Sequence, residues 1–102
     1  MFIAMNNFQI APGREADFEQ RWRERESYLR DVLGFVQFAL LKGDDAGEYI
    51  SHSTWKDRAS FIAWTESEHF TAAHRQGSLS GVIAGPPHVK LYEAVLLEQP
   101  AA

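Results

Sequence analysis

Three side chains of this 102-residue chain, Asn6, Trp64 and His74, have the chemistry to hold a ligand together. A neutral imidazole can ligate a metal, an amide can donate and accept hydrogen bonds, and an indole supplies a broad apolar surface. Taken singly, each of these residue types is more often a satisfied structural group. A functional role therefore requires that the fold bring the three side chains to one place.

The four histidines differ in how well they can reach an internal cavity. His69 lies in the first turn of an expected helix and should face solvent, and His88 opens the last expected strand. His52 lies between two serines in another expected strand, where hydrogen bonding satisfies it. His74, near the end of its helix, keeps the best access to a cavity between helices and sheet. The absence of cysteine excludes disulfides, thiolate catalysis and cysteine-bound metals.

A second pair of candidates, Trp22 and Arg25, lies on an expected helix with Phe18 and Leu29 on the same stripe. A charged residue on an apolar stripe needs an explanation. Arg25 either extends its guanidinium past the stripe to water or receives an anion such as a carboxylate. The sequence leaves both explanations open.

The elements that must position these residues follow from the periodicity of apolar residues. Alternation predicts a strand over 2–10 in which Asn6, and not Asn7, shares the apolar face. Asp57 and Ser67 are expected to cap the two helical segments that carry Trp64 and His74. The remaining expected elements are a helix over 14–30, a hairpin of strands over 35–41 and 49–55, an apolar loop over 76–87 suited to a lid, and a strand over 89–97.

The order β-α-β-β-α-β predicts an α+β fold of the ferredoxin-like, split βαβ type, with an antiparallel sheet and helices over one face. Apolar residues on both faces of several strands, Ile3 and Met5 among them, indicate that a second subunit covers the other face. We therefore expect a single domain over 1–102 that forms a homodimeric α/β barrel.

The overall charge narrows the class of partner. A formal net charge of -4 and a pI near 5.5 argue against nucleic acid and anionic membranes as partners, because both attract basic surfaces. The start of the chain has neither a basic flank nor an unbroken apolar run, so we expect a cytoplasmic protein. No zinc-protease, P-loop, dinucleotide or serine-hydrolase motif is present.

The strand with Asn6, the APG turn that follows it and the runs GFVQFALL and STWKDRASFIAWTESEHFTAAH form a recognisable pattern. Together with the final strand, this pattern resembles the IsdG-type haem-degrading monooxygenases of the antibiotic-biosynthesis monooxygenase superfamily. The resemblance covers nearly the whole chain and is weakest over 76–87.

The resemblance implies that His74 is the axial ligand of haem iron, that Asn6 lies on the opposite side and that Trp64 packs against the porphyrin. It places Trp22 beside the haem and Arg25 near a propionate. Haem would be both substrate and cofactor, opened with O2 and an external electron donor to release iron and a linear tetrapyrrole. The apolar lid residues Leu79, Val82 and Ile83 would close over it.

Two other functions remain open at this point. One is a cofactor-independent monooxygenase acting on aromatic polyketide-like substrates, which has no need of a ligand at His74. The other is a non-catalytic barrel that binds a small molecule.

Overall fold

The computed structural model describes residues 1–25, 27–68, 70–71 and 81–101. Four strands form one antiparallel sheet in the order β2-β3-β1-β4. The strands are β1 (Phe2–Gln9), β2 (Phe35–Lys42), β3 (Glu48–Trp55) and β4 (His88–Glu93). The helices are α1 (Glu15–Glu24), the 3-10 turn η1 (Leu29–Asp31) and α2 (Arg58–Thr65). This is the predicted ferredoxin-like arrangement, and the hairpin of β2 and β3 is confirmed.

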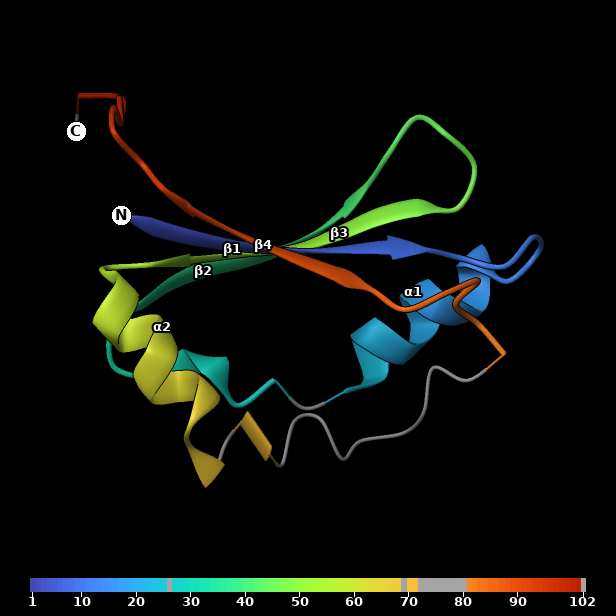
Figure 1. Cartoon of the computed structure of the whole chain (residues 1–102), viewed down its shortest axis with the longest axis horizontal. Coiled ribbons are helices and arrows are strands. Elements are labelled where there is room, and N and C mark those ends of the chain that lie inside the picture. The colour runs from blue at the N-terminus through green and yellow to red at the C-terminus, as the bar shows by residue number, and fades with distance from the viewer. Residues whose placement is uncertain (26, 69, 72–80, 102) are drawn as a thin grey trace.

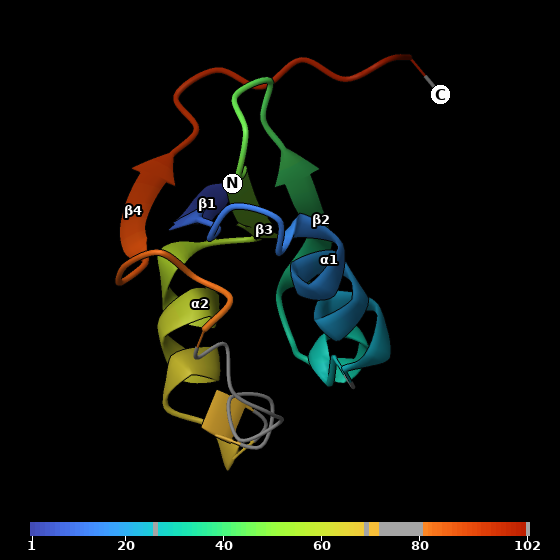
Figure 2. The same cartoon turned by 90° about the vertical axis from the view of Figure 1, so that its right-hand side faces the viewer.

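Both helices cover the same face of the sheet, toward opposite ends of its strands, as Figures 1 and 2 show. The core is correspondingly divided into two clusters. The cluster near α2 includes Phe2, Ala4 and Trp55, and the cluster near α1 includes Phe8 and Phe18. The predicted apolar face of β1 is confirmed by the burial of alternate residues along it: Phe2, Ala4, Phe8 and Ile10.

The helix expected over 14–30 is shorter, because α1 ends at Glu24 and Arg25 is already extended, with φ -73° and ψ 149°. The predicted stripe is therefore wrong beyond Trp22. Leu29 lies in η1 and packs in the cluster near α2 rather than beside Phe18. The residue that follows Trp22 on the apolar face of α1 is Arg25, so one more turn of helix would place a charged side chain there.

The capping predictions for the two later helical segments are confirmed in the described residues. Asp57 precedes α2, and its carboxylate accepts a hydrogen bond of 2.8 Å from the Ser60 N–H. The Ser67 hydroxyl accepts a hydrogen bond of 3.2 Å from the Phe70 N–H. Both bonds satisfy backbone donors that the first turn of a helix leaves open.

The last strand and the loop before it also differ from expectation. β4 ends at Glu93 because β1, its partner, begins at Phe2, and residues 94–97 have no strand to pair with. Val82 is fully buried in the cluster near α1, and Ile83 bridges to Ile10. These two residues are therefore part of the core and cannot form the predicted lid; Leu79 lies outside the described residues.

None of the described helices lies on the other face of the sheet (Figure 1). Cross-strand register places Ile3 opposite Thr54 and Tyr92, and Met5 opposite His52 and Lys90 on that face. Within the described residues, no helix is long and apolar enough to cross a bilayer.

Candidate functional site

Asn6 lies between the two core clusters, on the strand face that points toward the helices. Its neighbours on that face are Ala4 of one cluster and Phe8 of the other. Its Oδ1 atom is buried and has no hydrogen-bond partner among the described residues. A buried amide oxygen without a partner costs about 1–3 kcal/mol, so this position is unsatisfied within the described part of the chain.

Asn7 differs from Asn6 in just this respect. It points to the opposite face of the strand, and its Nδ2 donates a hydrogen bond of 3.3 Å to the backbone carbonyl of His88. The two amides therefore differ, because Nδ2 of Asn7 has a partner whereas Oδ1 of Asn6 has none among the described residues.

Trp64, near the end of α2, packs against the cluster that contains Ala4. Its ring lies 5.3 Å from the ring of Trp55 and 4.8 Å from that of Phe70, measured between centroids. Trp64 is thus a packing residue of the core in addition to being a candidate site residue.

Trp22 and Arg25 lie together on the α1 side of the same face. The rings of Trp22 and Phe38 are stacked with centroids 5.4 Å apart, and the Arg25 guanidinium carbon lies 4.1 Å from the Trp22 centroid. Burial lowers the pKa of the Arg25 guanidinium from its ordinary value. Of the two explanations for Arg25, simple extension into water does not describe this stacked, half-buried side chain.

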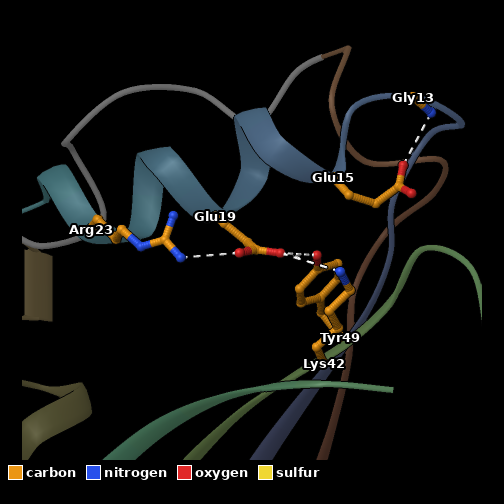
Figure 3. A network of polar contacts seen from close by, with 6 residues as sticks. All are labelled: Gly13, Glu15, Glu19, Arg23, Lys42 and Tyr49. Carbon is orange, nitrogen blue, oxygen red and sulfur yellow. Dashed lines mark hydrogen bonds and ion pairs between the residues drawn. The ribbon is translucent and has the colours of Figure 1, made fainter. Parts of the chain in front are cut away.

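These two residues line a cavity of about 380 Å³ between α1, β2 and β3. Its far end holds a network centred on Glu19, drawn in Figure 3. The Glu19 carboxylate accepts a short hydrogen bond from the Tyr49 hydroxyl, lies 3.1 Å from Arg23 Nη2 and 3.8 Å from Lys42 Nζ. This network is not predictable from the motifs of the sequence, where the one sign of it is a carboxylate, Glu19, one turn before Arg23 on the expected helix.

The hydrogen bond from Tyr49 lowers the pKa of Glu19, and the charges of Lys42 and Arg23 act in the same direction. For Tyr49 itself, burial and then the hydrogen bond to Glu19 raise the pKa to about 12. Both shifts keep the phenol neutral and the carboxylate charged at neutral pH.

The Tyr49 shift predicts how stability depends on alkaline pH. A phenol whose pKa is raised in the folded state stabilises the protein fully below its unfolded pKa of about 10. That contribution is lost as the pH rises through about 12. We expect the urea midpoint of the wild type to fall between about pH 10 and pH 12, and the fall to be smaller in Tyr49→Phe. An equal fall in both proteins would contradict this assignment.

Two of the four histidines, His52 and His88, lie among the residues that the structure describes. His74 and His69 lie outside the described residues, so the predicted ligand role of His74 stays a prediction. His88 opens β4 as predicted, and His52 lies in β3, half-buried. The described residues contain no group of three or more side chains able to hold a metal ion, although a haem iron needs only one histidine from the protein.

Comparison with known proteins adds two findings. The family model described as "Antibiotic biosynthesis monooxygenase" matches residues 1–76. Among solved structures, the heme-degrader MhuD from Mycobacterium tuberculosis, with two hemes bound in its active site, superposes with a TM-score of 0.79 at 23% identity. That match covers 97% of this chain and 100% of MhuD.

Two further structures are similarly close. A mutant of MhuD with two manganese protoporphyrin IX molecules per active site has a TM-score of 0.81 and 22% identity, covering 98% of this chain and all of the other. A Bacillus cereus protein named for the antibiotic biosynthesis monooxygenases has a TM-score of 0.80 and 19% identity, with 100% and 98% covered. At these identities the matches show a common fold.

Proposed function

Because the chain belongs to the antibiotic biosynthesis monooxygenase family, we propose that it is a haem-degrading monooxygenase. In this proposal the protein binds haem between its two helices and the sheet. It opens the porphyrin with O2 and an external electron donor, which releases iron and a linear tetrapyrrole. Haem then serves as both substrate and cofactor, and it supplies the iron at which O2 reacts.

The observation that carries the proposal is the buried Oδ1 atom of Asn6, which lies between the two core clusters and has no hydrogen-bond partner among the described residues. A ligand group that donates a hydrogen bond would pair with this Oδ1, and one that accepts would pair with the Nδ2 of the same amide. The surrounding apolar side chains would bury a flat hydrophobic ring. The structural match to haem-bound MhuD supports the choice of haem over other flat ligands.

Each proposed site residue has a distinct task. His74 would hold the iron through a neutral imidazole, and the amide of Asn6 would hydrogen bond to a ligand group in the same site. Trp64 would supply a broad indole face that restricts the position of the porphyrin. The ring of Trp55 packs against that of Trp64. Trp22 and Arg25 border the haem on the α1 side, where Arg25 offers its guanidinium to a propionate.

We further propose that the protein is a homodimer whose sheets face each other. The helix-free face carries apolar side chains, among them Leu41 and Tyr92, which are 43% and 45% exposed. Placing two such faces together would remove this apolar surface from water. The cytoplasmic location stays a prediction.

A haem titration tests the function. We expect the wild type to develop a sharp Soret band that saturates at one haem per chain or a small multiple, and His74→Ala to lose it, because the iron then lacks its protein ligand. His52→Ala is the matched control, because the strand register places His52 opposite Met5 on the sheet face away from the helices. This variant should keep the band. Absence of haem binding at micromolar protein would refute the proposal.

Aerobic addition of a reductant then distinguishes an enzyme that degrades haem from a protein that only carries it. The enzyme is expected to bleach the Soret band and free iron even when catalase removes stray peroxide, whereas a carrier would keep its haem. Haem-independent oxidation of an aromatic polyketide-like substrate, unchanged in His74→Ala, would instead identify a cofactor-independent monooxygenase.

A further inference from the structure

We propose that residues 94–97, which we call the apolar arm, pair as a strand with the free edge of β2 in a second copy of this chain. This inference rests on the homodimer proposed above, and it names the contact that joins the two sheets at their edges. In that dimer the sheets face each other through the sides on which none of the described helices lies. The arm follows β4 directly, and it reaches from one sheet to the other.

The arm has the residue pattern of a strand, but its backbone has no partner strand. Apolar residues recur at alternate positions of the strand predicted over 89–97, at 89, 91, 95 and 97. The backbone pairing of β4 stops at Ala94, whose N–H donates a hydrogen bond of 2.9 Å to the carbonyl of Met1. Within the described residues, no backbone group of 95–97 takes part in a backbone hydrogen bond. The arm therefore offers the open donors and acceptors of an unpaired strand.

The side chains of the arm form an apolar surface that its own subunit leaves in water. Val95, Leu96 and Leu97 are 98%, 77% and 53% exposed. Of the twelve large apolar side chains that are exposed among the described residues, six lie within 89–97. Apolar residues scattered singly over a surface need no explanation, but a concentration of this kind is typical of a protein contact.

The direction of the arm favours a second copy as its partner. Figures 1 and 2 show that the chain after β4 leaves the sheet on the side that faces away from α1 and α2. The arm does not pack on its own sheet, because its apolar side chains are exposed. The dimer proposed above places a second copy on this side, so the arm of each copy meets the sheet of the other.

The topology of the sheet favours β2 as the strand that the arm meets. The strand order β2-β3-β1-β4 makes β2 and β4 the two edges. If the arm after β4 pairs with β2 of the second copy, two-fold symmetry repeats the contact on the other side of the dimer. The two sheets then close into one barrel, which removes the free edges at which strands of other chains could add. The exposed Val36 and Leu41 of β2 offer apolar partners to the arm.

The test is an isotope-filtered NMR measurement on an equal mixture of 13C-labelled and unlabelled haem-free chains. In this mixture only contacts between two copies give filtered cross-peaks. We expect cross-peaks between methyl groups of 95–97 in one copy and those of Val36 or Leu41 in the other. Cross-peaks from the arm to another part of the second copy, or none from the arm, would overturn the proposal.

Charged substitutions in the arm measure its share of the dimer contact. Leu96→Asp and Val95→Asp should each weaken dimerisation by at least about tenfold for each arm, hence about a hundredfold for the symmetric dimer. Sedimentation over a dilution series measures this change. Both side chains are exposed in a single copy, so the circular dichroism spectrum should stay that of the wild type. The matched control is Ile62→Asp, an exposed apolar position of α2 on the other face of the sheet, which should dimerise as the wild type does.

The outcomes distinguish this inference from the proposals on which it rests. Wild-type dimerisation in both Leu96→Asp and Val95→Asp would overturn the arm and leave the face-to-face dimer standing, whereas a monomeric wild type at micromolar concentration would overturn both. Haem binding is measured separately by the Soret titration. We expect Leu96→Asp to keep the Soret band and His74→Ala, which should lose it, to dimerise normally, because the proposed haem site and the arm lie on opposite sides of the sheet.

Discussion

Asn6→Ala is expected to bind haem as the wild type does and to lose turnover by about a hundredfold or more, the usual effect of removing one preorganised hydrogen-bonding group from a reaction site. The amide of Asn6 is buried and has an unpaired oxygen within the described structure, so its removal relieves an unsatisfied group instead of breaking a bond of the fold. The Soret titration measures binding, and single-turnover bleaching under a reductant measures the reaction.

Asn7→Ala is the matched control for this prediction. It removes the same amide from the opposite strand face, where Nδ2 of Asn7 donates a hydrogen bond to the backbone carbonyl of His88. Turnover close to that of the wild type is expected. If Asn6→Ala were fully active, or if both variants lost the same activity, the role assigned to Asn6 would be wrong.

Trp64 requires a gentler substitution, because it packs against Trp55 and Phe70. Trp64→Ala should also keep haem and lose turnover, but the cavity it leaves would lower stability by about 3–5 kcal/mol. Trp64→Phe preserves much of the packing and is the more informative variant.

Gly34→Ala is expected to destabilise the fold by about 3 kcal/mol, from the sum of two effects. Gly34 has a φ of +83°, where a side chain is strained, and a Cβ built on it would collide with both Cβ and Oγ of Ser60. Ser60 lies in the first turn of α2, where Asp57 accepts its N–H. The collision would push α2 away from the start of β2, and urea unfolding measures the loss.

Gly13→Ala isolates the backbone part of this effect. Gly13 has nearly the same φ, +80°, but outside its chain neighbours no atom of the described residues lies within 4 Å of a Cβ built there. We expect a loss of only about 1 kcal/mol in this variant. Equal losses in the two variants would show that Ser60 yields and that backbone strain alone sets the result.

Much of the fold was predictable from local patterns. Alternation in β1 identified the buried face and placed Asn6 on it, and Asp57 marked the start of α2. These features depend on residues close in sequence, so the sequence carries their signal directly.

The misjudged elements all depended on contacts distant in sequence. The stripe from Phe18 to Leu29 looked continuous, but Leu29 packs instead with Phe2 and Trp55 in the other cluster. The loop residue Val82 looked free to move, yet it is buried against Phe8 and Phe18. The local sequence pattern does not show where Leu29 and Val82 are buried, because the residues that pack against each of them lie far away in the chain.

By itself, the sequence determined the order of elements, the face on which Asn6 lies and the residue types available for a haem site, because periodicity and capping are local properties. Only the tertiary structure decided that Asn6 lies between two separate clusters, with an Oδ1 atom that no described residue pairs. It alone brought Arg25 onto Trp22 and joined Glu19 to Tyr49 and Lys42. The physical reason is that desolvation, stacking and charge pairing depend on distance in space, which the spacing of residues along the chain does not specify.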